Sequence, residues 1–251
     1  MDRASERGIS TKEYLKAEDE IYNLYKSSAI NENEILENLN LFTTVQHKKR
    51  EIFFYEIYKK IIGMPGSIIQ FGVRWGRELA LFEMLRTIFE PFNHSRSIYG
   101  FDTFTGYPKI KKKDQTKLIK TGGLAVSKNY EKYLNKLLKV REQLNPLPQT
   151  QKFNLIKGSV ENTLEPFLEK NKHQYFAMVH LDLNISSSTK FVIQKIKNRL
   201  FKGSIVIVDE TCHPEFSGEM SAIIEELGDI KLRFKRIPHI NSTWQSYFEV
   251  E

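Results

Sequence analysis

The feature that most constrains this chain is a repeated alternation of short apolar segments with longer amphipathic ones, beginning at Gly66. Five segments read as buried strands, each followed by a segment with helical spacing: SIIQFGV, SIYGFD, KFNLIKG, YFAMVHLDL and SIVIVDE. Strands that alternate with helices form a parallel sheet covered on both faces. Two further strand-like segments, IKLRFKRI and TWQSYFEV, close the chain and predict an antiparallel hairpin at the sheet edge. We therefore expect a doubly wound, mostly parallel, seven-stranded α/β sheet.

The first 62 residues lack this alternation and carry only helical patterns. Gly63, Pro65 and Gly66 then interrupt the chain before the first strand. We predict a helical N-terminal extension over residues 1–62, interpreted as a cap or a dimerisation element, and an α/β domain over residues 63–251. In the helix predicted at residues 76–90, the apolar residues that recur on one face are Leu81, Phe82, Leu85, Ile88 and Phe89.

Composition excludes several protein classes. Cys212 is the only cysteine, so no disulfide can form within the chain. The N-terminal residues lack an apolar signal core, and no apolar run reaches the roughly 18 residues that cross a bilayer. We predict a soluble, cytoplasmic protein without a membrane span.

The formal net charge is +7, and much of the excess lies in KIKKKDQTKLIK, residues 109–120. A basic surface attracts anions such as a phosphorylated small molecule, whereas the alternative interpretation is a solvated, mobile loop. No aromatic residues interleave with these lysines, so nucleic acid is not the expected partner.

The first strand ends in Gln70, followed by two glycines, Gly72 and Gly76, before a helix. This G-x-x-x-G spacing is neither a dinucleotide fingerprint nor a Walker loop. Glycines let a backbone approach a ligand closely, although a structural turn explains the spacing equally well. The second strand ends in Asp102, which could accept hydrogen bonds from both ribose hydroxyls of a nucleoside or could serve a turn. The two features together favour a nucleoside cofactor.

The fourth and fifth strands end in carboxylates. Asp182 follows the fourth strand, and Asp209 and Glu210 end the fifth. In a doubly wound sheet these ends are neighbours, and clustered carboxylates repel unless a cation joins them. A hard divalent cation is the natural occupant, whereas the alternative has Asp182 capping a helix and the other pair facing solvent. His213 follows closely and is either a base or a packing residue.

Four motifs together carry a family resemblance: QFGVRWG, YGFDTFTGYP, LDLNISSST and GSIVIVDE. They resemble those of the class I S-adenosylmethionine-dependent methyltransferases, and more narrowly the macrocin O-methyltransferase type, which methylates sugar hydroxyls. The resemblance implies a Rossmann-like methyltransferase fold. It also implies S-adenosylmethionine as the cofactor and Mg²⁺ as an assisting cation.

The resemblance assigns roles to individual positions. The implied cofactor residues, in chain order, are Gln70, Gly72, Gly76, Asp102, Gly158, Ser159 and Val160. Gly72 and Gly76 would line the methionine end of the cofactor, and Asp102 would hold its ribose. The last three residues of the list would border the adenine. The implied Mg²⁺ ligands are Asp182, Asp209 and Glu210. Either Asp182 or His213 would deprotonate the sugar hydroxyl.

Three positions depart from the family pattern. Gln70 replaces the usual acid, Asn184 replaces the second aspartate of D-x-D, and Ser159 stands where an aspartate is common. All three side chains can still form hydrogen bonds, so we expect altered affinity.

We expect metal-assisted O-methylation of a sugar hydroxyl on a glycan, a glycoside or a nucleotide-linked sugar. The acceptor is a small molecule or a glycan, with a phosphorylated one suggested by charge, and a homodimer is one expected assembly. The open alternatives are a catechol-type or other small-molecule O-methyltransferase, or a catalytically impaired cofactor-binding protein. A nicotinamide oxidoreductase is disfavoured by the G-x-x-x-G loop, and no RNA-binding module is visible.

Overall fold

The computed structural model describes residues 11–228, 233–240 and 244–251. These residues form two compact units that divide after Ile52. The first unit contains α1 (Lys12–Lys26), η2 (Leu39–Phe42) and the start of α2 (Val45–Ile61). The rest of α2 belongs to the second unit, and the division into functional domains at residue 62 stays a prediction. No helix in the described ranges is both long and apolar enough to cross a membrane.

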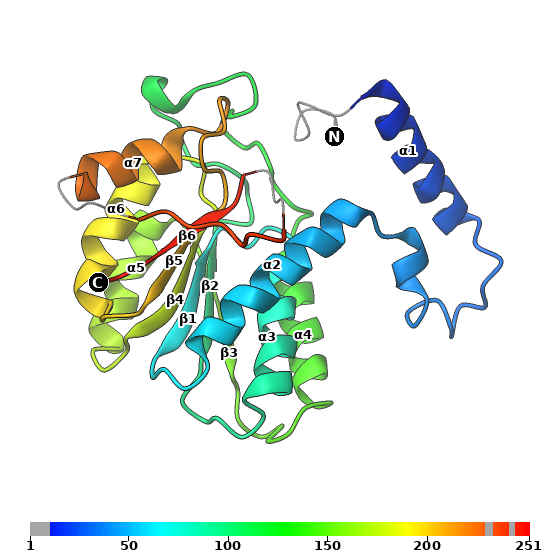
Figure 1. Ribbon diagram of the computed structural model, residues 1–251, viewed down its shortest axis with the longest axis horizontal. Helices are drawn as coiled ribbons and strands as arrows, with labels where there is room; N and C mark the ends of the chain where they lie inside the picture. Colours follow the sequence, from blue (N-terminus) through cyan, green and yellow to red (C-terminus); the bar gives the residue numbers. More distant parts are fainter. Residues whose placement is uncertain (1–10, 229–232, 241–243) are drawn as a thin grey trace. The chain divides into compact units, whose positions relative to one another are not determined.

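The second unit, Phe53–Glu251, alternates strands and helices as the sequence predicts (Figure 1). Its strands are β1 (Ser67–Phe71), β2 (Ile98–Asp102), β3 (Phe153–Lys157), β4 (Phe176–Leu181), β5 (Ile205–Val208) and β6 (Ser246–Glu249). Its α-helices after α2 are α3 (Arg77–Phe89), α4 (Tyr130–Glu142), α5 (Val160–Lys170), α6 (Ser186–Ile196) and α7 (Gly218–Leu227). Two short 3-10 helices complete it, η3 (Lys112–Asp114) and η4 (Lys197–Arg199).

The strands form one sheet in the order β3-β2-β1-β4-β5-β6. The first five are parallel, and β6 runs antiparallel to β5. The chain thus builds outward from β1 in one direction and then from β4 in the other, which confirms the doubly wound class. The carboxyl ends of β1 and β4 lie side by side at this switch point.

The predicted seventh strand needs correction. Six strands are present among the described residues. The predicted segment IKLRFKRI, residues 230–237, begins outside the described residues, and its described part makes one isolated antiparallel bridge, from Lys235 to Tyr247. The edge therefore has the antiparallel pairing of the predicted hairpin, but a single bridge is too little to define another strand.

Two apolar clusters cover the two faces of the sheet. The second half of α2 packs with α3 and α4 on one face, through residues such as Phe54, Phe82 and Leu138. The helices α5, α6 and α7 cover the other face through Leu164, Val192 and others, as Figure 1 shows. Because both faces are buried, the strands consist of continuous apolar runs. This arrangement leaves the carboxyl ends of the strands as the place for polar side chains.

The predicted apolar face of α3 is partly wrong. Phe82 and Leu85 are buried, but Ile88 is 65% exposed and Arg86 is buried instead. The Arg86 guanidinium donates hydrogen bonds to the backbone carbonyls of Asn93 and Arg96. Those carbonyls provide partners that a buried cation needs. The rotation of α3 therefore follows hydrogen bonding as well as apolar periodicity.

Candidate active site

The carboxyl ends of four strands meet in one row. Backbone hydrogen bonds continue past the strands, from Gly72 N to Phe101 O (2.9 Å), from Asp182 N to Phe71 O (2.9 Å) and from Asp209 N to Leu181 O (3.1 Å). The order along the row is therefore Asp102, Gly72, Asp182 and Asp209. The sequence predicted this convergence from strand order alone.

The turn after β1 requires glycine at two positions for different reasons. Gly72 has φ +90°, and a Cβ there would lie 1.9 Å from the carbonyl oxygen of Asp182. Gly76 has φ +81° at the N-cap of α3, and a Cβ there would meet the end of the Leu134 side chain on α4. Gly72 thus permits close approach of two backbones, whereas Gly76 serves the turn into the helix.

Asp102 holds this turn in place. Its Oδ2 accepts hydrogen bonds from the backbone N–H groups of Val73 and Arg74, both at 2.7 Å. Its Oδ1 accepts from the N–H of Phe104 at 2.5 Å. The turn and the acid of the second strand, read separately in the sequence, are therefore one structural unit. Each carboxylate oxygen can accept more than one hydrogen bond, so this arrangement is compatible with a further ribose hydroxyl.

Two further predicted cofactor regions flank this unit. Gly158, with φ +139°, donates its N–H to the carbonyl of Asp102 at 2.9 Å, and Ser159 and Val160 begin α5 just beyond. On the other side, Gln70 is fully buried and donates to the carbonyl of Gly72 at 2.7 Å. Its Oε1 is buried and accepts no hydrogen bond from any described residue. The structure thus brings the predicted cofactor residues to one edge, while their roles stay predictions.

The carboxylate cluster differs in membership from the predicted one. Among the described residues, His180, Asp182 and Asp209 offer ligand atoms that all lie within 4.8 Å of one another. Glu210, the third predicted ligand, is not in this group. His180 was missed as a member, although it stands two residues before Asp182 and so shares its side of the strand.

Glu219, on α7, ties the turns after β4 and β5 together. Its carboxylate accepts the N–H groups of Leu183 (2.7 Å), Asn184 (3.0 Å) and Glu210 (3.4 Å). The side chain is fully buried, and burial raises the pKa of Glu219 to about 7 although the backbone hydrogen bonds lower it. Gly218 allows the contact, because a Cβ there would lie 2.4 Å from the carbonyl oxygen of Asn184. No sequence motif pointed to Glu219.

Tyr107 and Asn184 meet beside Asp182. The Asn184 amide donates to the Tyr107 hydroxyl at 3.1 Å, and Asn184 has φ +60°, which asparagine tolerates. Burial raises the pKa of Tyr107, and the negative charge of Asp182 raises it further. The phenol therefore stays protonated near the carboxylate. Tyr107 is part of the YGFDTFTGYP motif, which is the signal that could have identified it.

His213 lies after β5, packed against the rings of Phe216 (4.8 Å) and Trp244 (4.5 Å). Its Nδ1 accepts the backbone N–H of Glu215 at 3.2 Å, and burial lowers the pKa of His213. In a neutral imidazole this bond uses the lone pair that would take up a proton. The geometry therefore favours Asp182 over His213 as the base.

The model of the macrocin O-methyltransferase family (TylF) matches residues 41–245. This chain belongs to the macrocin O-methyltransferase family. It is accordingly an S-adenosylmethionine-dependent O-methyltransferase, as the four motifs predicted. A search of curated protein sequences gave no match.

Solved structures agree with membership of the macrocin O-methyltransferase family. A crystal structure of CalS11, a calicheamicin methyltransferase, has a TM-score of 0.92 and 31% identity, covering 96% of this chain and 93% of that one. The apo structure of CalS11, described as a TDP-rhamnose 3'-O-methyltransferase, has a TM-score of 0.83 and 29% identity, covering 96% and 95%. The O-methyltransferase NovP shares the fold, with a TM-score of 0.60 and 18% identity, covering 80% and 79%.

The lysine-rich segment, residues 109–120, is anchored beside the strand ends. Asp114, which is buried, accepts the N–H of Ser186 at the start of α6 at 2.9 Å. Ile119 is buried in a small apolar cluster with Ile185 and Phe216. The exposed lysines of the segment are Lys109, Lys111, Lys112, Lys117 and Lys120. These two anchors favour a segment that is docked beside the strand ends, rather than the solvated, mobile loop that was the alternative interpretation. We call residues 109–120 the basic cover.

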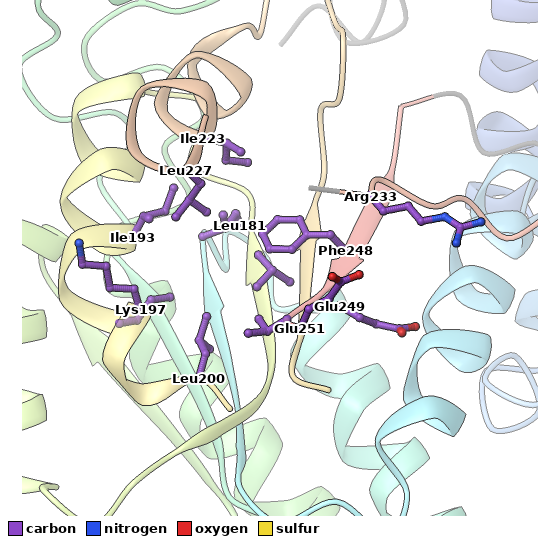
Figure 2. A pocket seen from close by; sticks show the side chains of 13 residues that line it. Leu181, Ile193, Lys197, Leu200, Ile223, Leu227, Arg233, Phe248, Glu249 and Glu251 are labelled. Atoms are coloured by element: carbon purple, nitrogen blue, oxygen red, sulfur yellow. The ribbon is translucent and has the colours of Figure 1, made fainter. Parts of the chain in front are cut away.

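An apolar pocket lies on the face of the sheet that α5, α6 and α7 cover, between α6, α7 and β6 (Figure 2). Its walls include Ile193, Ile223 and Phe248. Two lining residues, Leu227 and Arg233, flank residues 229–232, which are outside the described chain. The glycine turn and the carboxylate row do not line this pocket, so it is separate from the candidate active site.

Proposed function

We propose that this chain transfers a methyl group from S-adenosylmethionine to a sugar hydroxyl with the assistance of a divalent cation. The observation that carries the proposal is the row formed by Gly72, Asp102, Asp182 and Asp209 at the switch point of the sheet. The acceptor class follows from CalS11, because that protein is described as a TDP-rhamnose methyltransferase and resembles this chain over nearly its whole length. A nucleotide-linked sugar or a glycoside is the proposed acceptor.

The residues at the row fit the cofactor. Gly72 lets the turn after β1 lie directly against the backbone of Asp182, and Asp102 presents a carboxylate beside this turn. The buried Oε1 of Gln70 is an acceptor of the kind that the cofactor's ammonium group would satisfy. The cofactor supplies the sulfonium leaving group, so the protein must position both reactants and exclude water.

The carboxylates of the row also fit a divalent cation. Asp182 and Asp209 are the proposed ligands, and Glu210 is the third predicted one. Hard cations prefer such carboxylate oxygens, and a bound cation lowers the pKa of a coordinated hydroxyl. When bound, S-adenosylmethionine would supply the methyl group, and its carbon–sulfur bond would break as the acceptor oxygen takes up the methyl carbon. The hydroxyl proton passes to the carboxylate of Asp182.

Calorimetry of S-adenosylhomocysteine binding, with and without Mg²⁺, tests the proposal. Asp102→Ala is expected to weaken binding by about tenfold to a hundredfold, because it removes the ribose acceptor and releases the N–H groups that shape the turn. Asp102→Asn, which keeps one acceptor oxygen, should weaken it less.

A matched control is Glu142→Gln. Glu142 also accepts a backbone N–H, from Lys152, but at the amino end of β3, where it pairs with the Lys152 ammonium as well; a glutamine oxygen can still accept both. Binding should be unchanged in this variant. If the wild type does not bind S-adenosylhomocysteine, the chain is a family member that has lost its cofactor site, as Gln70 would then indicate. If it binds the cofactor but methylates no sugar, the impaired cofactor-binding alternative holds.

The basic cover suggests a phosphorylated acceptor. Replacing Lys111, Lys112 and Lys113 by Gln should raise KM for a nucleotide-linked sugar by about three- to tenfold at low salt and leave kcat nearly unchanged. Steady-state kinetics at two ionic strengths would measure this effect.

Three exposed lysines near the amino ends of the strands serve as the control: Lys170, Lys172 and Lys202. Their replacement by Gln removes the same charge and should leave KM unchanged. An equal rise in KM for both triple variants would show that net charge, rather than the cover, attracts the acceptor.

A further inference from the structure

His180 lies in the middle of the sheet, yet it carries a polar ring. It is fully buried on β4, with its ring edge-on to Phe54 at 5.0 Å and to Phe82 at 6.3 Å between ring centroids. Burying an imidazole against phenyl rings costs free energy unless the ring forms a hydrogen bond. Its Nε2 meets that need, because it lies 3.1 Å from Oδ1 of Asp209.

The same carboxylate oxygen receives a second donor. The Gln245 side chain, which is also buried, donates its Nε2–H to Oδ1 of Asp209 at 2.8 Å. His180 comes from β4, Asp209 follows β5, and Gln245 immediately precedes β6. Two donors, one on β4 and one just before β6, therefore fix the rotation of one carboxylate. Hydrogen bonds to a charged acceptor are among the stronger ones, so this orientation is well determined.

The proximity of His180 to both carboxylates could suggest that it is itself a metal ligand. However, a carboxylate only accepts hydrogen bonds, so the bond to Asp209 requires a proton on Nε2. A protonated ring nitrogen has no lone pair for a cation. The other nitrogen, Nδ1, keeps its lone pair in this tautomer, but it is buried and forms no hydrogen bond with a carboxylate or any other described group, whereas the nitrogen that meets Asp209 is Nε2.

We propose that His180 and Gln245 are positioning residues that orient the Asp209 carboxylate for a divalent cation, and that His180 is not a ligand. The proposal rests on the metal-assisted function proposed above. Residues that orient a metal ligand in this way commonly change metal affinity by tenfold to a hundredfold when they are replaced.

The test uses Mn²⁺ as the probe, with calorimetry for affinity and pulsed electron paramagnetic resonance for nitrogen ligands. In His180→Gln the side-chain amide can still donate to Asp209, so Mn²⁺ affinity should stay within about threefold of the wild type. His180→Leu has no donor and should weaken binding by about tenfold or more. The wild-type spectrum should show no directly bound imidazole nitrogen.

Gln245→Leu provides an independent variant on another segment, just before β6, and should weaken Mn²⁺ binding similarly. Unchanged S-adenosylhomocysteine affinity in each variant shows that the neighbouring turn remains folded. The inference is overturned if wild-type Mn²⁺ couples to a nitrogen that both His180 variants lose, or if all variants bind Mn²⁺ like the wild type. A wild type that binds S-adenosylhomocysteine but not Mn²⁺ overturns it together with the metal-assisted step.

Discussion

Gly72→Ala is expected to abolish S-adenosylhomocysteine binding and to lower the free energy of unfolding by at least about 3 kcal/mol. The added Cβ would lie 1.9 Å from the Asp182 carbonyl oxygen and 2.8 Å from its carbonyl carbon. These are backbone atoms in the row of strand ends, so relief requires moving Asp182 itself. The φ of +90° adds strain for any residue with a side chain. Urea unfolding and calorimetry would measure the two effects.

Gly63→Ala is the matched control for Gly72→Ala. Gly63 has φ +81°, but a Cβ there would meet nothing within 4 Å. Its replacement should cost only about 1 kcal/mol, for the backbone conformation alone, and should leave cofactor binding intact. If both variants lost similar stability and both still bound S-adenosylhomocysteine, the close contact between Gly72 and Asp182 would be unimportant for stability and for cofactor binding.

Glu219→Gln is expected to flatten the pH dependence of stability between about pH 5 and pH 7. Burial raises the pKa of Glu219 to about 7 in the folded protein, from the ordinary value of 4.5 for a glutamate carboxyl. Between these values the folded state binds the proton more tightly than the unfolded state does. Stability therefore falls as pH rises through this window, by about 3 kcal/mol in total, and is level above it.

Glutamine cannot ionise, so the Glu219→Gln variant should lose this slope. Urea unfolding at intervals from pH 5 to pH 8 would compare the slopes. The control is Glu226→Gln on the same helix, α7, because a hydrogen bond from Lys190 lowers the pKa of that carboxyl. A lowered pKa affects stability only below about pH 4.5, so this control should keep the wild-type slope. If Glu219→Gln also keeps the wild-type slope, Glu219 is not the group that causes the pH dependence of stability.

Much of the fold could be predicted because local patterns and sheet topology agree. The five apolar runs are continuous since both faces of a parallel sheet are covered, and this leaves polar residues at strand ends. Their ends then have to meet at the switch point. That reasoning located the glycine turn, Asp102, Asp182 and Asp209 correctly relative to one another.

The errors share a cause, which is that periodicity reports apolar burial and not hydrogen bonding. It placed Ile88 in the core of α3, whereas the carbonyls of Asn93 and Arg96 draw Arg86 inward. It also predicted a strand over IKLRFKRI, residues 230–237, of which residues 233–237 are described and make a single bridge at Lys235. Pairing with a distant strand is not encoded in a short segment.

The sequence by itself determined the class of the sheet, the row of strand ends and the family to which the chain belongs. Those properties depend on patterns within short segments. Only the tertiary structure decided how the row is held: Glu219 from α7 joins two turns, and His180 with Gln245 orients Asp209. Each of these contacts joins side chains that are distant along the chain, and a hydrogen bond depends on position to within a few tenths of an ångström. Such positions exist only after the chain has folded.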